Sequence, residues 1–113
     1  MEFVRIKNGD IVRHFKKETT DGSNPYQYLY RVINTNARET DNCNRVVVYE
    51  ALYDNGEGVK VGDIFVRRYE EFMSEVDHVK YPNIKQKYRF EPTSIWQRRE
   101  IEMGSLSLFL FGT

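Results

Sequence analysis

The sequence predicts one small domain of the mainly β class. A β-branched and aromatic run at residues 45–53 is followed, after a glycine-containing connection, by a second such run at residues 64–67. Two runs of this composition around a glycine-containing connection are typical of a pair of antiparallel strands. The chain has 113 residues, of which 40% are hydrophobic, so it can bury one modest core and not two.

Turn signals separate these runs from two earlier strands. We expect the first strand at residues 9–15 and the second at residues 28–33, because β-forming residues there are flanked by turn-forming ones. The segments 16–27 and 34–44 are rich in polar and turn-forming residues, and both are predicted to be loops.

The part of the chain after the fourth strand combines a helical turn with a last strand. Tyr69, Phe72 and Met73 are spaced so that all three lie on one side of a helical turn, which would cover one end of the sheet. Pro82 prevents regular strand pairing in the basic segment around it. We therefore expect an irregular excursion there, followed by a last short strand at residues 88–90.

Many short strands with turns between them, and no long amphipathic helix, favour a small barrel or sandwich over a parallel βαβ fold. We expect an SH3-like five-stranded β-barrel with a short helical turn over residues 1–91, and a C-terminal extension over residues 92–113. In the extension, Ser94 and Gln97 have the spacing of a capping box, and Gly104 is placed to end a helix.

Residues 105–113 alternate at first and are then continuously apolar. We interpret them as a strand that packs on the chain's own sheet or body. The alternative is an exposed strand that docks to a protein partner or forms a homodimer. The residues expected to make this interaction are Leu106, Leu108, Phe109, Leu110 and Phe111.

The charges of the chain cancel, since 17 Lys and Arg residues balance 17 Asp and Glu residues. A neutral chain has no global positive field to attract nucleic acid, although this does not exclude a local patch. Cys43 is the single cysteine and cannot form an internal disulfide, and the N-terminus has no secretion signal. No stretch is apolar for long enough to span a membrane. We therefore expect a cytoplasmic protein with no membrane partner.

Several sequence words occur in the same order as in a known family. They are Arg13-His14-Phe15-Lys16, Val47-Val48-Tyr49-Glu50-Ala51-Leu52-Tyr53, Phe65-Val66-Arg67, Phe72, Lys80-Tyr81-Pro82 and Gln86-Lys87-Tyr88-Arg89-Phe90. On these words the chain resembles, from Gly9 to Glu91, the bacterial and phage family catalogued as domain of unknown function 1653. It departs from the family at Arg68, where Pro is usual, and in a longer connection between the first two strands. The resemblance implies a small SH3-like barrel, and the family has no established activity to carry over.

The sequence offers no set of residues for catalysis or for metal binding. One cysteine and two distant histidines, His14 and His78, match no standard metal-ligand spacing. No phosphate loop, nucleophile elbow or dinucleotide fingerprint is present. We therefore expect no cofactor, no metal and no enzymatic activity.

Arginine and aromatic residues in or beside the strands are the first candidates for binding. Guanidinium groups recognise phosphate or carboxylate, and tyrosine rings supply stacking faces. The predicted ligand-binding residues are Arg13, His14, Tyr49, Tyr53 and Arg67. Each also has a structural interpretation: the tyrosines as half-buried wall residues, Arg67 as the cross-strand partner of Glu50, and His14 as a residue bonded to a backbone carbonyl.

The second candidate is a basic patch within residues 78–99, which contrasts with an acidic stretch at residues 39–57. Its predicted contact residues are Lys80, Lys85, Lys87 and Arg89. Such a patch supports contact with phosphates or with an acidic protein face, and it is as often only a solvated surface. We therefore expect a non-catalytic binding module for an anionic or planar ligand. A nucleotide or nucleic acid is the first candidate, and a protein partner or homodimer is the alternative.

Overall fold

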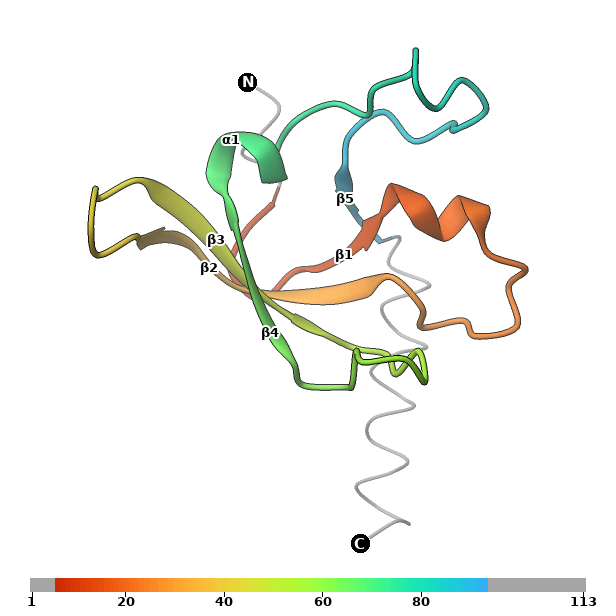
Figure 1. The fold of residues 1–113 in the computed structure, drawn as a ribbon, viewed down its shortest axis with the longest axis horizontal. Coiled ribbons are helices and arrows are strands. Elements are labelled where there is room, and N and C mark those ends of the chain that lie inside the picture. Colours follow the sequence, from red (N-terminus) through yellow and green to blue (C-terminus); the bar gives the residue numbers. More distant parts are fainter. Residues whose placement is uncertain (1–5, 94–113) are drawn as a thin grey trace, which may run out of the picture.

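Five antiparallel strands form one sheet in the computed structural model, which describes residues 6–93 (Figure 1). The strands are β1 (Ile11–His14), β2 (Leu29–Arg38), β3 (Arg45–Ala51), β4 (Ile64–Arg68) and β5 (Phe90–Pro92). Their order in the sheet is β4-β3-β2-β1-β5. A 3-10 helix, η2 (Phe15–Thr19), follows β1, and a helical turn, α1 (Tyr69–Phe72), follows β4. The mainly β class is therefore confirmed.

Strand β2 is longer than the sequence predicts. Residues 34–38, expected to begin a loop, continue the strand and pair with β3 across two register shifts. Polar side chains support this irregular stretch: Asn34 Oδ1 accepts a hydrogen bond from the Asn36 N–H at 2.8 Å, and Asn8 Oδ1 accepts one from the Thr35 N–H at 2.9 Å. A bulge leaves backbone N–H groups without a partner in the neighbouring strand, and in this stretch side-chain amide oxygens accept their hydrogen bonds. The loop prediction is wrong for this part.

One face of the sheet, the inner face, carries the main core. Its buried residues, brought to one side by the alternation of side chains along strands, are Val12, Tyr30, Val32, Val47, Tyr49, Ala51 and Phe90. The turn α1 closes over this face, as predicted: Phe72 and Met73 are buried in the same cluster, and Tyr69 packs against it. The rings of Phe72 and Phe90 stack with their centroids 4.0 Å apart.

The predicted barrel is not closed among the residues that the structure describes. Strands β4 and β5 are the two ends of the sheet order and do not pair with each other. The Phe72 side chain lies between β3 and β5, since its ring stacks on Phe90 of β5 and lies 5.2 Å from the Tyr49 ring of β3. The core is therefore packed on this side by side chains, without a backbone ladder between β4 and β5.

The segment 74–89 is irregular, as Pro82 predicts, and it packs against η2. Val76 and Ile84 form a small buried cluster with Phe15, and the Tyr81 ring lies edge-on to Phe15 at 5.0 Å. β5 begins at Phe90, where the predicted last strand ends. This packing brings the first and last parts of the described chain together at one end of the sheet (Figure 1).

The predicted C-terminal helix and strand lie outside the described residues. So do the predicted interaction residues Leu106, Leu108, Phe109, Leu110 and Phe111. Between residues 6 and 93, no helix is both long and apolar enough to cross a membrane.

Candidate anion-binding site

His14 stands where β1 passes into η2, and its ring is buried on the inner face. Its Nδ1 accepts a hydrogen bond from the Lys16 N–H at 3.1 Å and so caps the 3-10 helix. An N–H can only donate, so Nδ1 carries no proton and the neutral ring has its hydrogen on Nε2. The ring is held against Phe15 at 4.5 Å and edge-on to Phe90 at 4.9 Å between centroids.

The charge around His14 is strongly positive. Burial, the largest cause, and then the nearby positive charges of Arg67, Arg89 and Lys16 together lower the pKa of His14 from its ordinary 6.5 to about 3. His14 is therefore neutral at physiological pH. It offers an uncharged Nε2–H donor among cations that favour the approach of an anion.

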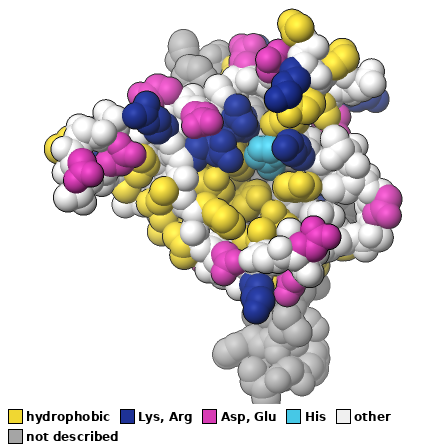
Figure 2. All heavy atoms as spheres, in the orientation of Figure 1, with side chains coloured by type: hydrophobic (Ala, Val, Ile, Leu, Met, Phe, Trp, Pro, Cys, Tyr) yellow, Lys and Arg dark blue, Asp and Glu magenta, His cyan; other side chains and the backbone are white. Residues whose placement is uncertain are grey.

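These residues surround a hollow of about 350 Å³, which we call the His14 hollow. It is lined by His14, Phe15, Lys16, Arg67, Asp77, Lys80, Tyr81 and Arg89. Four of these side chains are cationic and one is acidic. Figure 2 shows a histidine among Lys and Arg side chains on this face, next to an extensive hydrophobic area.

The two arginines are held in place by their Nε atoms. Arg89 donates from Nε to the Glu71 carbonyl at 3.1 Å and to Ser74 Oγ at 3.3 Å. No carboxylate among the described residues forms an ion pair with Arg89. Arg67 donates from Nε to Tyr49 Oη at 3.2 Å, and its Nη1 lies 3.4 Å from Glu71 Oε2. Both guanidinium groups are thus oriented by the protein before any ligand arrives.

The alternative pairing of Arg67 with Glu50 does not occur. Glu50 is opposite Ile64 in the β3–β4 register, whereas Arg67 is opposite Val47, so the two charged side chains leave opposite faces of the sheet. Glu50 instead lies 3.7 Å from Arg31.

Tyr49 and Tyr53 lie within the core and do not line the His14 hollow, and each is only 4% exposed. Tyr49 receives the Arg67 hydrogen bond, and the Tyr53 hydroxyl lies 2.9 Å from that of Tyr30. Burial, the largest cause, raises the pKa of both Tyr30 and Tyr53, which keeps their hydroxyls protonated. Tyr49 and Tyr53 therefore support the site from within the core, because little of either ring is exposed to solvent.

Arg13 lies on the opposite face from His14, as neighbours in a strand must. It lines a second hollow, the Arg13 hollow, of about 570 Å³, whose other lining residues are Lys17, Glu18, Asn83 and Lys85. Of the predicted basic patch, Lys80 and Arg89 line the His14 hollow and Lys85 lines the Arg13 hollow. Lys87 lines neither, and its Nζ lies 5.3 Å from the Tyr88 ring centroid.

Sequence reasoning does not identify Lys16 or Tyr81 as site residues. Lys16 is part of the same word as His14, and its place two residues after a capping histidine is the signal that points to it. Tyr81 reaches the site only through the packing of its segment on Phe15. No local pattern predicts that contact.

Tyr28 is a further residue beside His14, and its backbone is strained. Its φ of 67° lies in the left-handed region, which is rare for a bulky residue and costs on the order of 1–3 kcal/mol. Its carbonyl accepts the His14 N–H at 3.0 Å, and its ring lies 5.8 Å from the His14 ring. The strained conformation therefore holds an aromatic ring next to the buried imidazole.

In the part of the chain described, no three His, Cys, Asp or Glu side chains come close enough together to hold a metal ion. The donors of the His14 hollow are instead N–H groups and cations. This arrangement can hold an anion, and it offers few oxygen ligands for a cation.

Comparison with known proteins places the chain in one family. No curated protein matches the chain, and no solved structure matches it either. A family model described as "Protein of unknown function (DUF1653)" matches residues 10–92 of the 113. That match spans the whole sheet and both hollows. The chain therefore belongs to the DUF1653 family of proteins of unknown function.

Proposed function

We propose that this protein is a non-catalytic binding module for an anionic ligand, held in the His14 hollow. The observation that carries the proposal is the set of four cations, Lys16, Arg67, Lys80 and Arg89, gathered around a neutral histidine. Like charges in one place repel, and a bound anion would remove that repulsion. The fold therefore maintains a positive site that a ligand would stabilise.

One acid, Asp77, lines the hollow, and a second, Glu71, pairs with Arg67 at 3.4 Å from outside the lining. Asp77 Oδ1 accepts hydrogen bonds from the Val79 and Lys80 N–H groups, both at 3.1 Å, and so shapes its own loop. No ion pair joins Asp77 to a cation of the hollow among the described residues. The guanidinium groups of Arg67 and Arg89 suit a phosphate, which they recognise through paired N–H donors.

The ligand class we favour is a phosphate-bearing planar molecule, that is, a nucleotide or nucleic acid. Tyr81 lines the hollow beside Lys80 and supplies a ring on which a base can stack. A non-catalytic role fits the low pKa of His14, because such an imidazole is a poor general base at neutral pH.

The test is a titration of the full chain with inorganic phosphate and with adenosine monophosphate. Binding is followed by calorimetry and by the imidazole Hε1 resonance of His14. Arg89→Gln should weaken binding about tenfold or more, since a charge-assisted hydrogen bond is worth about 1.5–3 kcal/mol. Arg68→Gln is the matched control, because Arg68 is exposed and adjacent to Arg67 on the opposite face. Equal losses in both variants, or no saturable binding by the wild type, would contradict the proposal.

A second candidate is a protein-interaction module or homodimer that uses the C-terminal segment. The observation in its favour is the outer edge of β4, which pairs with no other strand among residues 6–93 and where Ile64 is 54% and Val66 is 65% exposed. An apolar strand edge of this kind invites pairing with another strand. Deleting residues 105–113 tests it by light scattering and thermal melting. A dimer that becomes a folded monomer supports this candidate, and a monomer that only loses stability indicates self-packing.

Three finer expectations also stay proposals. We propose that the open five-stranded sheet is SH3-like, supported by its antiparallel strands and the helical turn between β4 and β5. A bacterial or phage origin rests on the family resemblance of the sequence words. A reducing, cytoplasmic location rests on the single cysteine, Cys43.

A further inference from the structure

Two positively charged hollows share two bounding segments at one end of the sheet, and Arg13 and His14 enter them from opposite faces of β1. The His14 hollow contains Lys16, Lys80 and Arg89, and the Arg13 hollow contains Lys17 and Lys85. Both are built from the same two segments, because η2 and the segment 77–89 each contribute residues to both. Lys16 and Lys17 are consecutive, with Cα atoms about 3.8 Å apart. The two hollows therefore lie on the two sides of the ridge where η2 packs on the second segment.

We propose that the ligand is a single strand of nucleic acid, whose backbone crosses this ridge and places one phosphate in each hollow. The inference rests on the proposed function, since the His14 hollow is its first phosphate site. A mononucleotide would leave the Arg13 hollow unused. A strand has repeated phosphates and matches two cationic sites at the two sides of one ridge.

Glu18, the acid of the Arg13 hollow, accepts hydrogen bonds from backbone N–H groups, as Asp77 does in the His14 hollow. Glu18 accepts the Lys85 N–H at 2.9 Å on Oε1 and the Gln86 N–H at 2.8 Å on Oε2. The Arg13 Nη2 lies 4.0 Å from Glu91 Oε1, at the limit of an ion pair. Lys85 has no ion pair within residues 6–93. Positive charge therefore predominates in the second hollow also.

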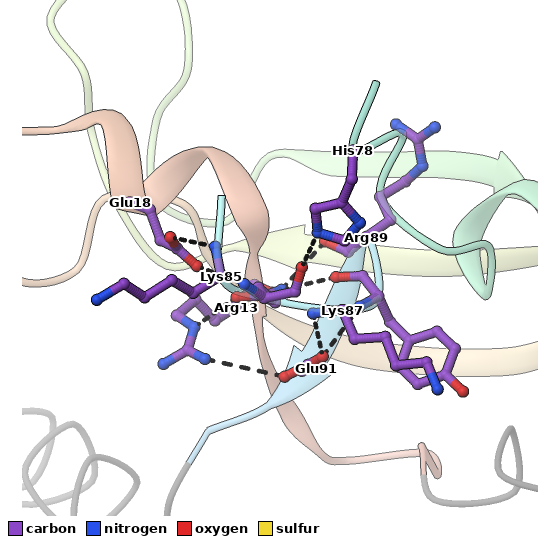
Figure 3. A network of polar contacts seen from close by, with 9 residues as sticks. Arg13, Glu18, His78, Lys85, Lys87, Arg89 and Glu91 are labelled. Carbon is purple, nitrogen blue, oxygen red and sulfur yellow. Dashed lines mark hydrogen bonds and ion pairs between the residues drawn. The ribbon is translucent and has the colours of Figure 1, made fainter. Parts of the chain in front are cut away.

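The ridge between the hollows is rigid. Gln86 is 4% exposed and joins its own segment to β1: its Nε2 donates to the Arg13 and Tyr88 carbonyls, both at 2.9 Å, and its Oε1 accepts from Arg13 Nε at 2.8 Å. Figure 3 shows this network, with the guanidinium groups of Arg13 and Arg89 on either side of the segment. A fixed ridge keeps the two phosphate sites at a constant separation, which favours a polymer over two unrelated ions.

An aromatic ring lies on this ridge and favours a single strand over a duplex. Tyr81 is half-buried against Phe15 and lies in the sequence between Lys80 of the first hollow and Asn83 of the second. Only unpaired bases expose a face to such a ring. A peptide with one phosphorylated residue would fill one hollow and gain nothing from the second.

The experiment is fluorescence anisotropy of the full chain with labelled oligothymidylates of about eight nucleotides, within the usual site size of a small domain. We expect the oligonucleotide to bind at least about tenfold more tightly than thymidine monophosphate. Lys85→Glu should remove most of that gain and reduce the slope of log affinity against log salt by about 0.7, the value for one single-strand phosphate contact. Lys87→Glu is the matched control, because Lys87 is in the same segment and lines neither hollow.

The possible results of this experiment distinguish a failure of the two-hollow inference from a failure of the proposed anion-binding function. Phosphate should still shift the His14 resonance in Lys85→Glu, since that variant leaves the first hollow intact. If phosphate binds but the oligonucleotide gains nothing over the mononucleotide, the two-hollow inference is overturned and the anion site stands. If Lys87→Glu weakens binding as much as Lys85→Glu, general charge attraction explains the gain and the inference also fails. Tighter binding of a duplex than of the single strand would refute the single-strand assignment. If neither phosphate nor oligonucleotide binds, both proposals fall.

Discussion

Substituting Gln86 by Leu should both destabilise the fold and weaken the site. The change removes the donor of the Arg13 and Tyr88 carbonyls and the acceptor of Arg13 Nε. Each buried polar group left without its partner costs about 1–3 kcal/mol, and the added apolar surface of Leu offsets part of this. A net loss of about 2–4 kcal/mol in the free energy of unfolding corresponds to a drop of roughly 8–30 °C in Tm for a domain of this size.

Thermal melting followed by circular dichroism measures this change, with Gln27→Leu as the matched control. The described structure gives the Gln27 side chain no hydrogen bond, so its substitution should shift the Tm by no more than a few degrees. Gln86→Glu adds a sharper comparison. A carboxylate can still accept from Arg13, but it places an oxygen against two carbonyls and should also destabilise the protein. A Tm for Gln86→Leu within about 3 °C of the wild type would refute the reasoning.

The other predictions concern the core and the histidine. Val47→Asp should unfold the domain, because Val47 is fully buried and an unpaired charge there costs several kcal/mol, whereas Val48→Asp on the other face should leave it folded by circular dichroism. Phe72→Ala should cost about 3–5 kcal/mol in urea unfolding, since its ring fills the space between β3 and β5. His14 has a pKa of about 3 in the folded state and 6.5 otherwise, so the unfolded chain binds the proton first. The free energy of unfolding should therefore fall as the pH drops from about 6.5 towards about 3, by up to about 1.4 kcal/mol per pH unit, and His14→Gln should flatten that slope in urea titrations.

Local composition and spacing are sufficient to predict most strands and the helical turn. The runs 45–53 and 64–67 are β-formers on both faces, and the turn at Tyr69 and Phe72 has the spacing of one helical side. Strand length at β2 was not predictable in this way, because Asn34 and its neighbours are poor β-formers that stay in the sheet through side-chain hydrogen bonds to the backbone. The open sheet was not predictable either, because whether β4 and β5 pair is decided by tertiary packing, in which the Phe72 ring lies between β3 and β5.

In the candidate site, too, local sequence patterns predict some features, and only tertiary packing determines the others. Alternation along a strand implies that Arg13 and His14 face opposite ways, so the sequence alone already separates them. It does not reveal that Lys16 of η2 and Arg89 of the last segment converge. Their convergence depends on the burial of Phe15, Val76 and Ile84 between two segments that are distant in the chain.

The pairing of β1 with β5 explains why the two ends of the family pattern meet at one site. His14 is opposite Phe90 in this register, and the Phe15 N–H donates to the Arg89 carbonyl at 3.0 Å. Arg89 therefore reaches the imidazole only when β5, three residues long, is paired with β1. A short strand held by few ladder hydrogen bonds gains stability from any ligand that binds residues on both of its sides. The proposed anion binding would then share one equilibrium with the docking of the last strand, so we predict that phosphate protects the β5 amides from hydrogen exchange more than it protects those of β3.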